Sequence, residues 1–118
     1  MIRVVLAYIP LTLWAAGVLV VGGLDLGVGS LPSGSDKVAH FLAYGVGGGL
    51  AALAGRWSRG AGWWGLVFVA LVAMVDELHQ GTVVYRTADV WDWVADMAGA
   101  LLFYSLVRRI PRKGAGGE

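Results

Sequence analysis

The sequence predicts an all-α, polytopic membrane protein, built as a bundle of four transmembrane helices with both termini in the cytosol. Of its 118 residues, 58% are hydrophobic and only 14% are charged, and the mean hydropathy is +0.70. Soluble domains have about 25% charged residues, so this composition is too apolar for an ordinary globular protein. Four apolar segments fill most of the chain, which has room for a single domain.

The positions of the four helices follow from these apolar segments. They are expected at residues of about 2–24, 36–55, 61–80 and 88–107, followed by a disordered tail at 108–118. The first segment is long enough to cross a hydrocarbon core of about 30 Å. It also has the basic residue and apolar run of a signal peptide, but three further spans favour an uncleaved helix, which Pro10 is expected to kink. Ser35 or Asp36 can cap the second helix.

Small residues recur at every fourth position of the second segment. Ala43, Gly47 and Ala51 form one line along the expected helix, and Gly45 and Gly49 form another. This spacing is typical of membrane helices whose backbones approach closely. We therefore expect the second helix to pack through these lines against other helices of the same chain, rather than to form a dimer.

The orientation follows from the basic residues, which fall mainly at one set of helix ends. That set is flanked by Arg3, Arg56, Arg59, Arg108, Arg109, Arg112 and Lys113, and the other set is flanked by Lys37 and Arg86. Cytosolic loops of membrane proteins carry an excess of Lys and Arg, which places both termini in the cytosol. All acidic residues except Glu118 fall toward the outer ends, so the polar groups are expected to face outward.

The stretch 74–80 concentrates this polarity. It ends an uncharged apolar run and then places two carboxylates, a histidine and an amide within five positions. Such groups at the end of a membrane helix cost free energy unless partners meet them. The sequence offers His40, Arg86, Asp92 and Asp96 as partners. Glu77 is expected to face the bundle interior, where a carboxylate indicates a functional site; the alternative is a structural ion pair with Arg86.

Two residues are candidates for catalysis by proton transfer. His40 lies one helical turn from Asp36, whose carboxylate can orient its ring, and Glu77 is the carboxylate within the membrane. The alternative for His40 is a solvated histidine at a helix end. The candidates for ligand binding are Asp36, Lys37, Gln80, Arg86, Asp92 and Asp96. The i, i+4 spacing of Asp92 and Asp96 is repulsive, so either a cation relieves it or one of them is protonated.

Other kinds of site are less well supported. His40, Glu77, His79, Asp92 and Asp96 have suitable ligand atoms for a divalent ion. However, the chain has no His-Glu-x-x-His motif and no cysteine, so we predict neither a metal nor another cofactor. It also lacks the Gly-x-Ser-x-Gly motif of a serine nucleophile. A net charge of +1 without a basic stripe argues against nucleic acid as a partner.

Three stretches together resemble the VanZ-like family of small bacterial membrane proteins. They are Asp36-Lys37-Val38-Ala39-His40-Phe41, then Asp76-Glu77-Leu78-His79-Gln80, then Arg86 followed by Asp92, Asp96 and Gly99. The resemblance implies a four-helix, multi-pass protein of the bacterial plasma membrane that is linked to envelope glycolipid chemistry. The name-giving member is associated with resistance to the glycopeptide teicoplanin. Asp96 stands where the family usually has asparagine, which makes a neutralising partner more necessary.

Two classes of function remain open, and both place the chain in a lipid bilayer. In the first, the protein binds or modifies an outward-facing, anionic lipid-linked ligand such as a cell-wall precursor. Arg86 and Lys37 would hold its phosphate, and His40 and Glu77 would move a proton if the site is catalytic. In the second, the protein is a structural or interaction protein whose polar cluster only locks the packing of its helices.

Overall fold

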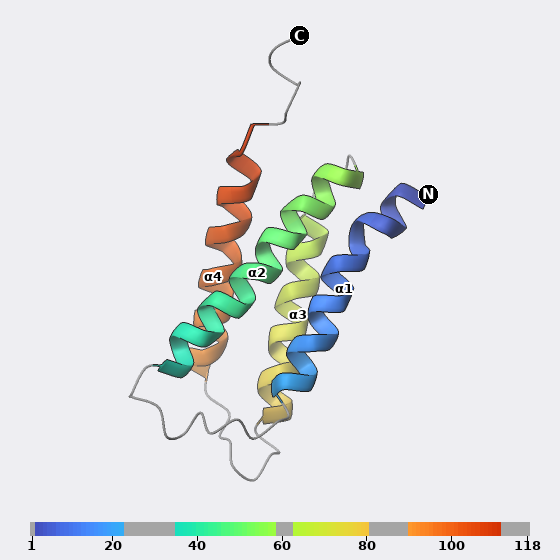
Figure 1. Cartoon of the computed structure of the whole chain (residues 1–118). Coiled ribbons are helices and arrows are strands. Elements are labelled where there is room, and N and C mark those ends of the chain that lie inside the picture. The colour runs from blue at the N-terminus through green and yellow to red at the C-terminus, as the bar shows by residue number, and fades with distance from the viewer. Residues whose placement is uncertain (1, 23–34, 59–62, 81–89, 112–118) are drawn as a thin grey trace.

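The computed structural model describes residues 2–22, 35–58, 63–80 and 90–111. Within these ranges all regular structure is α-helical, as predicted, and it consists of α1 (Ile2–Gly22), α2 (Ser35–Ser58), α3 (Trp63–Gln80) and α4 (Val90–Arg109) (Figure 1). The observed ends lie within three residues of the expected ones. Arg108 and Arg109, which we expected in the tail, continue α4, and residues 112–118 lie outside the described part of the chain.

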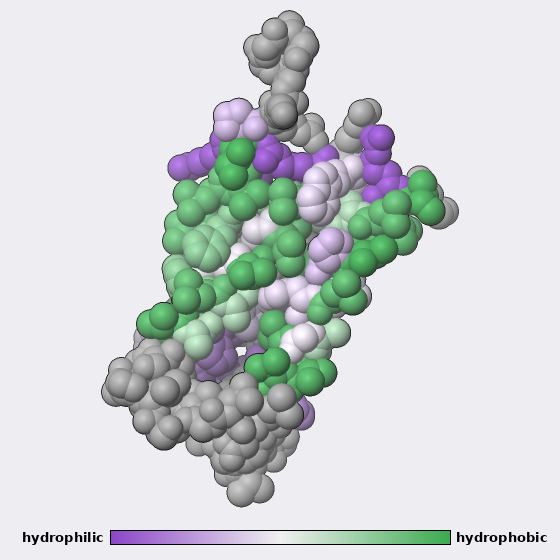
Figure 2. Space-filling model, in the orientation of Figure 1, coloured by the Kyte–Doolittle hydropathy of each residue, from purple (hydrophilic) through white to green (hydrophobic). Residues whose placement is uncertain are grey.

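The described helices carry apolar surfaces suited to a membrane. Three of them, α1, α2 and α4, are long and apolar enough to cross a bilayer. The fourth, α3, has 18 residues and carries Asp76, Glu77 and His79 in its last turns. A band of hydrophobic residues, green in Figure 2, covers the middle of the helices, and many large apolar side chains on it are exposed. Lipid tails rather than water suit such a surface.

α2 is the central helix. It packs against α1, α3 and α4, and its contact with α4 is the most extensive in the described structure. The buried core between the helices is made mainly of small, β-branched and aromatic residues, among them Tyr44 and Ala51 of α2, Val69 of α3 and Ala100 of α4. Small residues allow helices to pack closely where lipid leaves no hydrophobic driving force between them.

Two glycines set the distance between α2 and α4. A Cβ atom at Gly48 would lie 2.0 Å from the carbonyl oxygen of Ala100, and a Cβ atom at Gly99 would lie 2.0 Å from that of Phe41. Both neighbours are backbone atoms, so a side chain at either glycine would push the helices apart. Gly48 belongs to neither of the lines that we expected to mediate packing.

The two lines of small residues that we expected on α2 make its contacts elsewhere along the helix. A Cβ atom at Gly47 would lie 2.5 Å from the ring of Trp14 in α1, and one at Gly45 would lie 2.0 Å from the ring of Phe103 in α4. Ala51 is fully buried and lies against Gly65 of α3. The small residues of α2 therefore face three different helices, as packing within one chain requires.

The two ends of the bundle differ in charge. At the end where α2 and α4 finish, Arg56 donates from Nη1 to the carbonyl oxygen of Val107 at 3.2 Å, and from Nη2 to that of Ile110. Arg108 and Arg109 lie in the last turn of α4 at the same end. The buried acidic residues gather at the opposite end, where α2 and α4 begin and α3 finishes (Figure 1).

Candidate functional site

The candidate site is a group of buried polar side chains from three helices. They are His40 of α2, Asp76 and Glu77 of α3, and Asp92 and Asp96 of α4. Helical periodicity places them together, because residues three or four apart share one face. On α2 that face carries Lys37, His40 and Tyr44.

α2 and α4 are joined by His40 and Lys37. Nδ1 of His40 lies 2.6 Å from Oδ1 of Asp96, and its Nε2 lies 3.8 Å from Oδ2 of Asp92. Lys37 donates from Nζ to Oδ1 of Asp92 at 2.6 Å. Lys37 and His40 of α2 thus contact both carboxylates of α4, which would repel each other at their i, i+4 spacing.

α2 and α3 are joined by Tyr44, whose hydroxyl donates to Oδ2 of Asp76 at 2.9 Å. The rings of Tyr44 and His40 lie parallel, with their centroids 6.3 Å apart and their planes within 5°. Trp14 of α1 meets Tyr44 edge-on, with centroids 5.2 Å apart, and donates from Nε1 to the carbonyl oxygen of Ala43 at 2.9 Å. These contacts restrain the rotamer of Tyr44, and the parallel rings make it one wall of the site.

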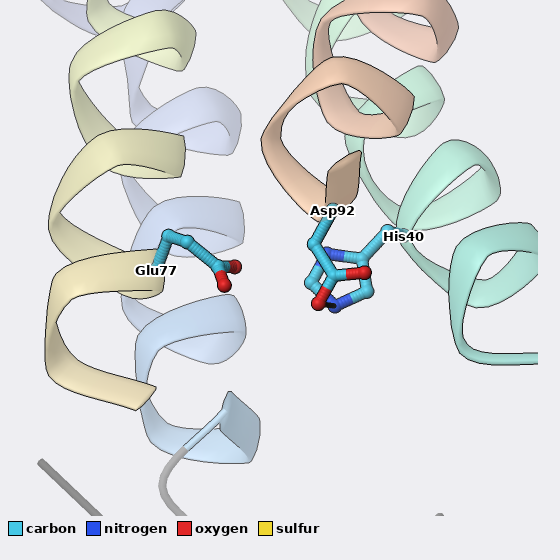
Figure 3. A group of neighbouring side chains, drawn as sticks. All are labelled: His40, Glu77 and Asp92. Atoms are coloured by element: carbon cyan, nitrogen blue, oxygen red, sulfur yellow. Dashed lines mark ion pairs between the residues drawn. The ribbon is translucent and has the colours of Figure 1, made fainter. Parts of the chain in front are cut away.

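Glu77 completes a group of three possible ligands. Figure 3 shows its side chain extending from α3 toward Asp92 of α4 and His40 of α2. One donor atom from each of the three residues lies within 4.8 Å of the other two, and all three residues are buried. This arrangement places one imidazole nitrogen close to carboxylate oxygens from two other helices.

Buried carboxylates gather at this end of the bundle, and two of their oxygen atoms are unsatisfied in the described structure. Oδ1 of Asp76 and Oδ2 of Asp96 are buried and have no hydrogen-bond partner in the described structure. Buried polar atoms are usually satisfied, so the site suits a ligand that brings positive charge or hydrogen-bond donors.

The polar contacts also run from the surface inward. The Lys37 side chain is 35% exposed, that of His40 is 10% exposed and that of Asp96 is 1% exposed. A ligand that approaches this end of the bundle would therefore meet Lys37 before the buried carboxylates.

The structure brings together five of the residues expected from the sequence, namely Lys37, His40, Glu77, Asp92 and Asp96. Asp36 and Gln80 lie in α2 and α3, but their side chains are outside the described part of the structure, and Arg86 is outside it altogether. The expected contacts of Asp36 with His40 and of Arg86 with Glu77 therefore remain predictions. His79 is exposed.

Sequence reasoning did not assign Tyr44 a role. The available signal was its position four residues after His40, which places a second polar ring on the same face of an apolar helix. Its partner Asp76 lies 32 residues away, so the contact itself depends on how α2 and α3 rotate against each other.

Comparison with known proteins links the chain to one family. The model of the VanZ/LLP1 family matches residues 5–111, which is most of the chain. No curated protein and no solved structure gives a match.

Proposed function

This chain belongs to the VanZ/LLP1 family, and we propose that it is a multi-pass protein of the bacterial plasma membrane that binds an anionic, lipid-linked ligand of the cell envelope. The binding site in this proposal is the polar group of Lys37, His40, Glu77, Asp92 and Asp96, together with the neighbouring carboxylate of Asp76. All four helices cross the membrane, and the site lies at the outward end of the bundle.

The proposed orientation rests on the distribution of basic residues. In the described ranges, Arg3, Arg56, Arg108 and Arg109 lie at one end of the bundle, and Lys37 lies at the other. The positive-inside rule then assigns the arginine end to the cytosol. It follows that the acidic site faces the side on which envelope precursors are used.

The observation that carries the proposal is the pair of unsatisfied buried oxygens in a polar group that also contains a partly exposed lysine. Oδ1 of Asp76 and Oδ2 of Asp96 lack partners among the described atoms, and Lys37 lies at the surface of the same polar network. A lipid-linked sugar phosphate suits both features. Its phosphate would contact Lys37 near the N-termini of α2 and α4, where the helix dipoles favour anions, and its hydroxyl groups would donate to the carboxylates.

A purely structural role explains the contacts between the helices but not the unsatisfied oxygens of the site. The contacts Lys37–Asp92, His40–Asp96 and Tyr44–Asp76 do tie three helices together. However, a cluster that served only to hold helices would be expected to satisfy its own buried oxygens, because each unsatisfied group costs free energy without adding a contact. The two orphaned carboxylate oxygens therefore favour a ligand site.

The test compares two lipids that differ only in their head group. Purified protein in nanodiscs is titrated with a polyprenyl phosphate and with the corresponding uncharged polyprenol. We expect the phosphate to bind at least about tenfold more tightly, because a hydrogen bond to a charged group contributes about 1.5–3 kcal/mol. Lys37→Gln should remove most of this preference, whereas Arg109→Gln, at the other end of the bundle, should retain it. Equal binding of the two lipids by the wild-type protein would contradict the proposal.

The proposed link to glycopeptide resistance has a separate test in cells. A susceptible strain that expresses the wild-type chain is expected to tolerate more teicoplanin than one that expresses Lys37→Gln at the same level. Equal susceptibility of the two strains, with the lipid preference intact, would remove the resistance role and leave the binding role.

A further inference from the structure

Three of the site residues lie close enough together to be ligands of one ion. His40, Glu77 and Asp92 come from α2, α3 and α4, all three are buried, and their donor atoms lie within 4.8 Å of one another (Figure 3). We propose that these residues bind a divalent transition-metal ion of the Zn²⁺ type. The sequence alone predicted no metal, because ligands contributed one by each helix leave no spacing motif.

The donor set matches this class of ion. One imidazole nitrogen with two carboxylate oxygens suits Zn²⁺ better than Mg²⁺ or Ca²⁺, which prefer oxygen ligands alone. Two ligands at about 2 Å from a tetrahedral ion are about 3.3 Å apart. Nε2 of His40 and Oδ2 of Asp92 are at 3.8 Å, and the ligand atoms of all three residues lie within 4.8 Å of one another, so side-chain rotations would bring them to this spacing. Three protein ligands leave a fourth position open.

His40 is also oriented as a metal-binding histidine should be. Its Nδ1 contacts the Asp96 carboxylate at 2.6 Å, and its Nε2 is directed toward Asp92. A proton on Nδ1 then leaves the lone pair of Nε2 available, which is the tautomer that a carboxylate partner fixes in metal sites. In this arrangement Asp96 is a positioning residue that acts through His40.

A second observation, independent of the three ligands, is the excess of buried negative charge beside them. Asp76 is 2% exposed and Asp96 is 0% exposed, and each has one oxygen without a partner among the residues described. Burying a carboxylate is costly unless a cation or hydrogen bonds compensate it. A divalent ion at His40, Glu77 and Asp92 would supply two positive charges where these carboxylates gather.

A bound metal ion would also explain how an acidic site binds an anionic ligand; this step rests on the proposed function. Carboxylates repel a phosphate, whereas a cation held by them attracts it. The open coordination position would accept a phosphate oxygen of the lipid-linked ligand, with Lys37 nearby at the surface. The metal would thus make an acidic site competent to bind an anion.

The test measures the metal alone. Tag-free protein is stripped with a chelator, exchanged into metal-free buffer and titrated with Zn²⁺, with bound metal counted by mass spectrometry and Co²⁺ used as a coloured substitute. We expect one Zn²⁺ per chain and a preference of at least about a hundredfold over Mg²⁺. His40→Gln and Asp92→Asn should abolish the high-affinity site. His79→Gln, which changes an exposed histidine near the same end of α3, should leave it unchanged.

If His40→Gln and Asp92→Asn do not fold, Asp96→Asn provides a further test of Zn²⁺ binding. Loss of an outer partner of a ligating histidine typically weakens metal binding about 10- to 100-fold, and we expect that loss together with a shift in the Co²⁺ spectrum. Absence of stoichiometric Zn²⁺ in the folded wild-type protein would overturn the inference. Equal loss of metal in His79→Gln and His40→Gln would overturn it as well.

The same samples separate the two proposals. Stoichiometric Zn²⁺ binding without a preference for polyprenyl phosphate would support the metal site and contradict the proposed function. A phosphate preference that survives chelation, in protein that takes up no Zn²⁺, would support the proposed function and overturn the metal site. A preference that disappears on chelation and returns with Zn²⁺ would support both.

Discussion

The imidazole of His40 and the carboxylate of Asp96 lie 2.6 Å apart although 56 residues separate them in the sequence. This contact joins α2 to α4 within the buried polar site, and it fixes the direction in which the other ring nitrogen faces. The carboxylate of Asp96 therefore affects both the stability of the fold and the orientation of His40 for ligand binding.

Asp96→Asn should raise or preserve stability, whereas Asp96→Leu should lower it. Asparagine still accepts a hydrogen bond from Nδ1 of His40 and removes a buried charge, one oxygen of which is unsatisfied in the described structure. Leucine leaves the ring nitrogen without its partner, at a cost of about 1–3 kcal/mol. Thermal unfolding in detergent measures both variants. Two equally destabilised variants would show that the charge of Asp96 itself stabilises the fold.

Tyr44→Phe should destabilise the protein by about 1–3 kcal/mol, because it removes the hydrogen bond to Oδ2 of Asp76 and strands a buried carboxylate. Changing Asp76→Leu as well should recover much of this loss, since no polar group is then left unsatisfied. The measurement is a double-mutant cycle by denaturant or thermal unfolding. Additive effects of the two changes would mean that the hydroxyl and the carboxylate are energetically independent.

A double-mutant cycle on Lys37 and Asp92 distinguishes a structural ion pair between helices from a ligand-binding site. Because Lys37 is 35% exposed, we expect a coupling energy on the order of 1 kcal/mol or less in the cycle of Lys37→Gln and Asp92→Asn. Both single variants should remain folded and lose the phosphate preference. Strong coupling, with lipid binding unchanged in the folded double variant, would support the structural role instead.

Gly48→Ala and Gly99→Ala should each destabilise the protein by about 1–3 kcal/mol, because the added methyl group would overlap a backbone carbonyl of the facing helix. Gly49→Ala is the matched control on α2. Its Cβ atom would lie 3.5 Å from Val107, an ordinary contact, so it should be neutral or stabilising through helix propensity. If Gly48→Ala is as stable as Gly49→Ala, the helices are not held at the distance described.

Cysteine labelling tests the orientation, since the chain has no native cysteine. Ser58 ends α2 at the arginine-rich end, and His79 is exposed near the end of α3 at the other. In intact cells, a membrane-impermeant thiol reagent should label His79→Cys but not Ser58→Cys, and it should label both after permeabilisation. The opposite pattern in intact cells would reverse the proposed topology.

The helices and most of the polar residues were predictable because each is encoded locally. Apolar runs of membrane length marked the helices, and charged groups within or beside them marked the candidate site. The partners were not predictable in this way. The contact of Asp36 with His40 stays a prediction, whereas the described polar contacts of His40 are with Asp92 and Asp96 of α4, far away in the sequence. Which faces meet depends on the rotation and crossing of α2 and α4, which Gly48 and Gly99 set through backbone contact.

The separation of α2 from α4 along the chain has a consequence for biosynthesis. Lys37 and His40 emerge from the ribosome well before Asp92 and Asp96, their contacts across 55 and 56 residues. During that interval the N-terminal end of α2 has two polar groups without the carboxylates that they later contact. We expect the insertion machinery to retain α2 until α4 arrives, so that crosslinks between α2 and the translocon should persist in nascent chains that stop before residue 90 and disappear in chains that include all of α4.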